Sequence, residues 1–548
     1  MSIFSTGLSG LNAAQSALNS TSNNISNVYT PGYNREVTQL GEGRAGGGVQ
    51  VNDIQRQFNQ YVASQLNAAT SKSSALESYN QQVEQIDSLL ADRDAGLAPL
   101  MQNFFSAMED LASAPSDPAA RQGVLGAADT LTAQFRSFDG YLQDMQEGIN
   151  GQIADEVTQV NNATEQLADI NREIALARAR SGEAPNSLLN QRDHMVHELN
   201  ERMDIRLNIQ DGKTYNISLP NGQPLVAGTQ HYSLEAMKAP NDPERTVLGY
   251  RDSNNDLVAL DEDTLTGGTL GGLMDFRSET LDKTQNQIGQ LAVSFAGELN
   301  AQHALGADLD GEQGGDLFRI GEPQVYSYAG NADPGATATA SFDEAQLNKL
   351  RATDYEVRLT ATPPGEGDFE VVRKGSGEVV DTTFDNDTNT LSFGGINLEF
   401  TNLSGAQAGD RFEVQPLRRA AAEMKTAIDD LDKIAASGNA DFGTGNNVNA
   451  LEMQALQDKL TVGGSASFSG AYGAMVSDVG NRTNIVQANL DAQQGLTKQL
   501  EAVQQSESGV NLDEEAANLI RYQQFYQANA RVIDTGTTIL DTILGLRN

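Results

Sequence analysis

Two histidines three positions apart are the strongest candidates for chemistry in this chain. His194 and His197 share one face of a predicted helix, as two metal ligands could, and Glu198 and Glu201 are close by. The order His-Glu-x-x-His, typical of zinc proteases, is absent. The apolar residues of the segment predict a buried stripe opposite the histidines, so we expect two solvated histidines without a metal. That stripe holds Leu188, Arg192, Met195, Val196, Leu199 and Met203.

An acidic turn is the second candidate. Asp308, Asp310 and Glu312 surround a glycine, as in a calcium loop, but the third oxygen ligand before the glycine and the terminal glutamate of an EF-hand are missing. We expect a surface turn there. His231 and His303 are isolated, and the sequence has neither a phosphate-binding loop nor a nucleophile elbow. The sequence therefore predicts no catalytic residue, no cofactor and no required metal.

The charge balance disfavours two classes of partner. The 548 residues include 36 lysines and arginines against 74 aspartates and glutamates, a net charge of −38. Such a chain repels nucleic acids and anionic membrane surfaces, so we expect neither partner. Residues 1–50 carry equal numbers of acids and bases, and residues 505–548 carry six acids and three arginines. Because the two ends carry little net charge, they can pack against the ends of other copies without strong repulsion, while the acidic middle of the chain keeps the protein soluble.

Cysteine is absent, which excludes disulfides and thiolate chemistry. No basic residue precedes Arg35 and no continuous apolar run follows Met1, so we expect no cleaved signal peptide. No stretch of about 18 apolar residues is present, so the sequence predicts no membrane span. On these features alone the protein would be assigned to the cytosol.

Helical periodicity dominates most of the chain. A first helix over residues 3–28 is rich in serine and asparagine, needs a partner, and stops at the proline and glycine that follow. A glycine-rich flexible joint is expected at residues 41–48. Longer helices are predicted at residues 62–90, 121–174, 273–303, 419–436 and 471–507, with Gly140, Gly148 and Gly151 as possible interruptions of the second.

Two regions change to the period of two that is typical of strands. Residues 204–210 and 215–219 predict a hairpin with a turn at Asp211 and Gly212. Residues 326–416 hold short alternating segments separated by glycines, which predicts a small β-domain inserted into the helical body. The predicted strands are 355–362, 369–373, 379–384, 390–393, 396–400 and 411–414.

The last predicted helix, residues 511–546, carries two apolar stripes. Asn511 can cap it, and Glu514 stands three residues on, as in a capping box. Two stripes imply neighbours on two sides, and three arginines are too few for a membrane-lying helix. One stripe holds Leu512, Ala516, Leu519, Tyr526, Ala530, Ile533, Leu540 and Leu544. The other holds Tyr522, Phe525, Val532, Ile539, Ile543 and Leu546.

Both ends of the chain resemble the flagellar rod, hook and hook-associated proteins. The N-terminal motifs are GLNAAQ at residues 10–15, SNNISN at 22–27 and TPGY at 30–33; the C-terminal ones are SGVNLDEE at 508–515 and YQQFYQANA at 522–530. Interior runs, DPAAR at 117–121, NSLLNQRD at 186–193 and NAQH at 300–303 among them, are similar to hook-associated proteins of the first type, which stand at the hook–filament junction. Residues 326–416 show no such likeness.

The resemblance implies a mainly α fold with β insertions, in which terminal segments form a long rod. The periodicity and the terminal motifs together divide the chain into an N-terminal assembly helix and linker (1–50), a helical rod with β-hairpins (51–325), an inserted β-rich outer domain (326–416), the returning rod (417–508) and a C-terminal assembly helix (509–548). The expected interface residues are Phe4, Leu8, Leu11, Leu18, Asn23, Asn24, Ile25, Asn27, Pro31, Gly32, Leu512, Leu519, Tyr522, Phe525, Tyr526, Asn529, Val532, Ile533, Ile539, Leu540 and Ile543.

The same resemblance implies an extracellular place in the flagellum, reached by type III export. The implied partners are further copies in a tubular zone, the hook protein below, the next hook-associated protein toward the filament, and an export chaperone on the C-terminal region. A hook or distal rod protein is the alternative, since those share the termini. An extracellular metal-dependent enzyme in the insertion is a third hypothesis, which the lack of histidine and cysteine in residues 326–416 disfavours.

Overall fold

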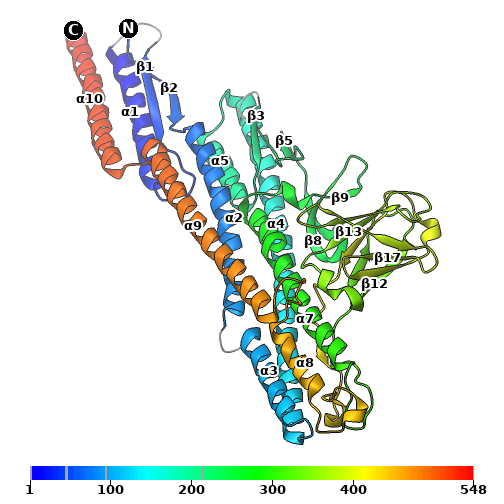
Figure 1. The fold of residues 1–548 in the computed structure, drawn as a ribbon. Coiled ribbons are helices and arrows are strands. Elements are labelled where there is room, and N and C mark those ends of the chain that lie inside the picture. The colour runs from blue at the N-terminus through cyan, green and yellow to red at the C-terminus, as the bar shows by residue number, and fades with distance from the viewer. Residues whose placement is uncertain (1–2, 44–46, 93–95, 211–213, 547–548) are drawn as a thin grey trace.

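The computed structural model describes residues 3–43, 47–92, 96–210 and 214–546. Figure 1 shows an elongated body of long helices with both chain ends at one extremity and a β-rich domain projecting from its side. The helices are α1 (Ile3–Ser26), α2 (Gln60–Leu90), α3 (Leu97–Ser113), α4 (Pro118–Ser181), α5 (Asn186–Arg202), α6 (Gly268–Phe276), α7 (Asp282–His303), α8 (Val448–Ala455), α9 (Phe468–Ser508) and α10 (Leu512–Gly545).

The longest helix, α4, runs the length of the body. Its 64 residues span about 96 Å at 1.5 Å per residue. Asp117 caps its N-terminus by accepting from the Ala119 N–H, Pro118 follows, and Gly182 ends it in the left-handed conformation. The three glycines that we considered as interruptions do not break it, because apolar residues in the preceding and following turns keep α4 packed on the core.

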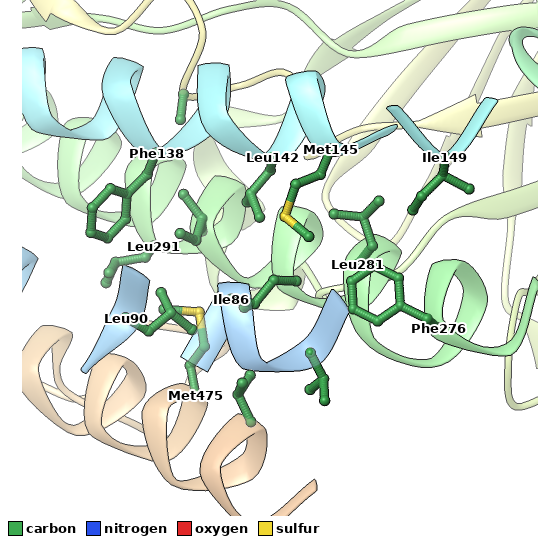
Figure 2. Packing of buried hydrophobic residues seen from close by; sticks show 14 of the residues in the cluster. Ile86, Leu90, Phe138, Leu142, Met145, Ile149, Phe276, Leu281, Leu291 and Met475 are labelled. Atoms are coloured by element: carbon green, nitrogen blue, oxygen red, sulfur yellow. The ribbon is translucent and has the colours of Figure 1, made fainter. Parts of the chain in front are cut away.

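The rod has one continuous apolar core between α2, α4, α6, α7 and α9. Figure 2 shows Ile86 and Leu90 of α2 between Leu142 and Met145 of α4 on one side and Met475 of α9 on the other. Side chains from sequence-distant helices thus meet in one core, which gives the rod its stability through apolar burial. The helices predicted at residues 62–90, 121–174 and 471–507 are confirmed. The helix predicted at 273–303 comprises the end of α6, a π-helical segment (Arg277–Leu281) and α7.

Several small antiparallel sheets are attached to the helical rod. Strands β1 (Glu36–Glu42) and β2 (Val49–Arg56) form an antiparallel hairpin. The joint predicted at residues 41–48 begins inside β1, and its residues 44–46 lie outside the described residues. Strands β3 (Arg206–Gln210) and β4 (Thr214–Ser218) confirm the second predicted hairpin, whose turn at Asp211 and Gly212 lies outside the described residues. The sheet order continues with β5 (Pro224–Ala227) and β6 (Gln230–His231); β7 (Leu234–Ala239), β8 (Asp242–Arg251) and β9 (Leu257–Ala259) form another sheet.

The inserted domain consists of two antiparallel sheets around a core of its own. One has the order β11-β19-β13-β14-β15 and the other β12-β18-β17-β16. The strands are β11 (Gln324–Ser327), β12 (Thr337–Phe342), β13 (Tyr355–Leu359), β14 (Phe369–Arg373), β15 (Val379–Val380), β16 (Thr383–Asp385), β17 (Thr390–Phe393), β18 (Ile396–Thr401) and β19 (Arg411–Gln415). The chain leaves and re-enters the rod at one place, where β10 (Phe318–Arg319) pairs with β20 (Lys425–Thr426).

The prediction of a helix at residues 419–436 is wrong. The segment contains β20, turns and a short 3-10 helix, Leu431–Lys433. Its carbonyls are satisfied by tertiary donors instead of by helical ones: Arg121 donates to Leu431 O at 2.8 Å and to Ile434 O at 3.0 Å. The buried side chains of Leu417, Ala420, Ala421 and Met424 hold this segment against the rod and the inserted domain.

A buried ionic network joins the inserted domain to the rod. Arg418, after β19, donates through Nε to Asp354 Oδ2 at 2.9 Å, and its Nη1 lies 2.9 Å from Asp282 Oδ1. Arg245 also pairs with Asp282. Burial works against ionisation of Asp282, but Arg245 and Arg418 outweigh it, and the pKa of Asp282 lies below its usual value. The network fixes how the domain sits on the rod.

Candidate assembly interface

The terminal helices α1 and α10 lie side by side and touch through small residues (Figure 1). A Cβ on Gly10 would lie 2.1 Å from Asn529 Oδ1, and one on Gly7 would lie 2.8 Å from Ile533 Cγ1. A larger residue at either position would therefore force the Asn529 or Ile533 side chain to move, so the close approach of the two helices favours glycine there. Ala13, Ala14 and Ala17 continue the buried face of α1. The sequence analysis missed the two glycines, although their spacing with the alanines at intervals of three and four was the available signal.

The large apolar residues predicted for α1 lie mostly beside this contact. Leu8 is 54% exposed, and Phe4, Leu11, Leu18 and Ile25 are half-buried. Because the small residues make the contact within the chain, the larger side chains keep part of their surface free for other molecules.

Helix α10 is almost uncovered. Within this helix, which is described throughout, only Glu515 and Gly536 are buried. Of the predicted interface residues, Leu519, Tyr522, Asn529 and Ile533 are half-buried. The exposed ones are Leu512, Phe525, Tyr526, Val532, Ile539, Leu540 and Ile543. The two stripes therefore leave a long apolar surface without a partner within the described chain.

Asn24 of the SNNISN motif ties the two chain ends together. Its Nδ2 donates to Glu36 O at 2.9 Å and to Glu515 Oε2 at 3.1 Å. Its Oδ1 accepts from the Glu36 N–H at 2.9 Å and from the Tyr33 hydroxyl at 2.8 Å. All four hydrogen-bonding positions of the amide are thus used in a buried place, which only asparagine or glutamine could do.

A buried glutamate completes this joint. Glu515, whose side chain is 2% exposed, accepts from Arg35 Nε at 2.8 Å, and Arg35 Nη1 lies 3.2 Å from Glu514 Oε2. The Arg35 N–H also donates to Ser508 O at 2.8 Å, at the end of α9. Burial and the nearby Glu36 and Glu515 raise the pKa of Tyr33, so its hydroxyl stays a donor. We name Asn24, Tyr33, Arg35, Glu36 and Glu515 the terminal clamp.

The TPGY loop contacts the rod directly. Gly32 has φ +72°, and a Cβ there would lie 2.6 Å from His194 Cβ, so both its conformation and its space require glycine. Asn34 donates to Asn190 Oδ1 at 2.9 Å, and Arg56 donates to the same oxygen at 3.1 Å. Of the other predicted residues, Asn23 and Pro31 are exposed, whereas Asn27 is half-buried and accepts from the Thr30 hydroxyl.

The prediction of two solvated histidines is only partly right, because the side chains of His194 and His197 are 34% and 28% exposed. His194 and His197 are half-buried, because the TPGY loop and α2 cover that side of α5, and they line a cavity of about 590 Å³. His197 Nδ1 lies 3.0 Å from Asn67 Oδ1, and burial lowers the pKa of His197. Within the described residues, no group of three or more histidine, cysteine, aspartate or glutamate side chains could hold a metal ion.

The acidic turn at Asp308 is occupied by a lysine. Lys433 Nζ lies 3.0 Å from Asp308 Oδ2, 3.0 Å from Asp310 Oδ2 and 2.8 Å from Glu312 Oε2. These hydrogen bonds raise the pKa of Lys433, which therefore stays a cation. An ammonium group thus stands where a calcium ion would have to bind.

Replacing Asn24 by alanine should loosen the terminal clamp. The substitution removes four hydrogen bonds and leaves buried polar atoms of Tyr33 and Glu515 short of a partner, which costs about 2–3 kcal/mol. Amide hydrogen exchange of residues 512–519 should accelerate accordingly. Asn23→Ala is the matched control, because the Asn23 side chain is exposed, and it should change exchange little. Equal effects of the two substitutions would contradict the clamp.

Zinc binding gives a direct check of the histidine pair. His194 Nε2 lies 3.5 Å from Glu198 Oε1 and His197 Nε2 lies 3.7 Å from Glu201 Oε1. Among the described residues, however, no three such side chains are arranged so that they could hold a metal ion. Purified protein should therefore show no stoichiometric zinc binding in calorimetric titration, and the double variant His194→Ala, His197→Ala should still support swimming. Tight binding at one zinc per chain, lost in the variant, would contradict this expectation.

Family models and full-length relatives agree on one family, the flagellar hook-associated proteins. The model described as flagellar hook-associated protein FlgK helical domain matches residues 83–318, the flagellar basal body rod FlgEFG protein C-terminal model matches 504–546, and the flagella basal body rod protein model matches 4–34. Flagellar hook-associated protein 1 of Salmonella typhimurium is 39% identical over 100% of both chains, and that of Escherichia coli is 38% identical over 100% of both.

A solved structure is similar over most of the chain. The flagellar hook junction protein FlgK from Burkholderia pseudomallei has 28% sequence identity and a TM-score of 0.74, and the match covers 81% of this chain and 99% of that one. This likeness confirms the predicted fold class. Among the described residues, no helix is both long and apolar enough to cross a membrane.

Proposed function

Because the chain belongs to the family of flagellar hook-associated protein 1, it is a structural subunit of the bacterial flagellum at the hook–filament junction, and we propose that its paired terminal helices build it into the axial tube. The observation that carries the proposal is the long apolar surface of α10, of which only Glu515 and Gly536 are buried within the described helix. The alternative of a hook or distal rod protein is not supported, since the full-length relatives are hook-associated proteins.

The exposed apolar stripes explain why the subunit needs neighbours. Side chains such as Phe525, Ile539 and Ile543, 44% to 62% exposed, form a continuous surface that a soluble monomer seldom leaves open. Copies of α1 and α10 that pack in a ring would cover it from two sides. In this arrangement Phe525, Val532 and Ile539 face one neighbour. The other stripe lies partly against α1 of the same chain, where Ile533 meets Gly7, and the surface that Leu519, Tyr526 and Ile533 leave open faces a second neighbour.

The same proposal assigns a role to each segment of the chain. Residues 1–50 and 509–548 assemble, residues 51–325 and 417–508 form the rod, and residues 326–416 form an outer domain. The subunit packs with further copies, with the hook protein below and with the next hook-associated protein toward the filament. An export chaperone covers the C-terminal region before assembly, and the chain reaches the extracellular end of the flagellum through the type III channel.

We assign no catalytic, cofactor or metal role to the protein, and neither nucleic acid nor membrane as a partner. The net charge of −38 and the Lys433 ammonium in the acidic turn support this assignment. A purely structural role follows, in which side chains act by packing.

Imaging of flagella from a deletion strain tests the function. Cells without the protein should build hooks that carry no filaments and should lose flagellin to the medium, and the wild-type chain should restore the filaments. A deletion strain without hooks would contradict a junction role, because it would place the protein in the rod or hook.

A further inference from the structure

The NAQH run forms the C-terminal end of α7 and ties neighbouring segments to it. Figure 1 shows α3 and α8 at the extremity of the body opposite the two chain ends, and the end of α7 lies with them. Asn300 Nδ2 donates to Phe318 O at 2.8 Å, and Gln302 Nε2 donates to Asn449 Oδ1 of α8 at 2.8 Å. His303 is the side chain of this run that can change its charge near neutral pH.

His303 is completely buried, and both of its ring nitrogens bond to backbone groups. Nδ1 lies 2.7 Å from Gly315 O, and Nε2 lies 2.9 Å from the Ala435 N–H. A carbonyl oxygen only accepts and an amide N–H only donates, so Nδ1 must carry the proton and Nε2 must be bare. A Cβ on Gly314 would lie 2.9 Å from Nδ1, so the loop packs closely over the ring. The geometry therefore requires the neutral imidazole in one tautomer.

The two bonded backbone groups belong to segments without an α-helix of their own. Gly315 lies in the loop after α7, and Ala435 lies in the segment that was wrongly predicted as a helix. Tertiary bonds hold these segments: the Ala307 N–H donates to Ser437 O at 2.9 Å, and Asn449 Nδ2 donates to Ala435 O at 2.7 Å. We name residues 304–317 and 430–437 the tip segments. The imidazole joins both of them to α7 at one point, so its loss loosens them together.

Charged groups act on the imidazole from the segments around it. Asp308 and Asp316 favour a positive ring, whereas Arg121 of α4 opposes it. The carboxylate of Asp308 already pairs with Lys433 Nζ at 3.0 Å, and Asp432 acts on Arg121. Burial is the largest influence, and it holds the pKa of this imidazole below its ordinary value. A second ring proton would also set an N–H against the backbone N–H that Nε2 now accepts from.

We infer that His303 is a proton-operated latch at this extremity of the rod: the neutral ring fastens the tip segments to α7, and the protonated ring releases them while the long helices stay folded. This switch goes beyond the proposed function, because it belongs to the single folded subunit.

The direction of the pH dependence follows from linkage. An opened ring takes up its proton near pH 6.5, whereas the closed ring does so only at lower pH. The latch is therefore fully closed above about pH 7. As the pH falls through 6.5, the opening equilibrium of the tip segments rises by up to about tenfold per pH unit, until the pKa of the closed ring is reached.

Amide hydrogen exchange of the purified full chain at about pH 7.5 and about pH 5, corrected for the intrinsic pH dependence of exchange, tests the inference. We expect the opening of the tip segments to rise several-fold at the lower pH, while that of residues 142–160 in α4 stays the same. His303→Gln keeps a donor and an acceptor but cannot titrate, so its tip segments should open equally at both pH values. His231→Gln, at an exposed position in β6, is the matched control and should behave like wild type.

Two results of the exchange experiment would overturn the inference. One is the same acid-induced opening of the tip segments in His303→Gln as in wild type, and the other is opening in wild type that does not depend on pH. Acid-induced opening that includes residues 142–160 equally would show general unfolding and would also overturn it.

NMR of the wild-type chain decides the matter if His303→Gln does not fold. The chain has four histidines, and substitutions of His194, His197 and His231 assign the other three ring signals. We expect His303 to carry its proton on Nδ1 at neutral pH and to titrate below its ordinary pKa of 6.5. A proton on Nε2, or titration at or above 6.5, would overturn the inference. Because these measurements use the monomer, such a result would leave the proposed function untouched.

Discussion

Removal of residues 512–548 should abolish incorporation of the subunit and leave cells with bare hooks, while the rod stays folded. Helix α10 buries only two of its own residues, Glu515 and Gly536, and contributes none to the two main apolar cores, so its loss takes little from the free energy of unfolding. The truncated protein should keep its helical circular dichroism per residue and a cooperative melting transition. Electron microscopy of the cells should show no filaments.

Hydrogen exchange distinguishes this from a general folding defect. The stripes of α10 remain largely uncovered in one chain, so residues 520–545 and α1 should exchange fast in a verified monomer and become protected after assembly. Residues 512–519 should be somewhat slower, because the terminal clamp holds Glu515. Strong protection of the whole of α10 in the monomer would contradict assembly-coupled ordering, and a truncated chain that melts without cooperativity would show that α10 supports the rod.

Asp354→Ala should destabilise the protein by about 3–5 kcal/mol, the usual effect of removing one partner from a buried ion pair. Asp354 is 4% exposed, and its carboxylate accepts from Arg418 Nε at 2.9 Å and from Asn286 Nδ2 at 3.1 Å. Without it, the buried Arg418 keeps only Asp282, which it shares with Arg245. Denaturant unfolding followed by circular dichroism measures the loss.

Glu356→Ala is the matched control for this network. Glu356 lies two positions further on, in β13, and its pair with Arg411 is half-exposed with a distance of 3.7 Å, so its loss should cost less than about 1 kcal/mol. Similar destabilisation by the two substitutions would show that the strand's backbone, and not the buried charge, joins the domain to the rod. A double variant, Asp354→Leu with Arg418→Met, should recover part of the loss because it leaves no unpaired charge.

Much of the helical architecture was predictable from the sequence. The apolar spacing of residues 62–90 and 471–507 identified α2 and α9, and Asn511 indicated the cap that the structure places on α10, where it accepts from the Asp513 N–H at 3.0 Å. Such signals are local, because a helix satisfies its own backbone and shows its buried face as a period. The alternating segments of residues 355–414 predicted strands for the same reason.

The failures arose where distant residues decide the outcome. Residues 419–436 have helical composition, but Arg121 and β10, more than 100 residues earlier, satisfy their backbone groups instead. The half-burial of His194 and His197 depends on the TPGY loop, which lies far from them in the sequence. The surface turn near Asp308 was predicted correctly, but its ion pairs with Lys433 form only in the fold.

At the candidate interface, too, local features were predictable from the sequence and contacts between distant segments were not. The sequence by itself determined the apolar stripes of α10 and the motif residue Asn24, since periodicity and motif are properties of the chain. Only the tertiary structure decided that Gly7 and Gly10 make the contact within the chain, that Glu515 closes the terminal clamp, and that the large side chains stay open. The physical reason is that a period shows which residues share a face, whereas what covers that face depends on distances between segments separated by hundreds of residues.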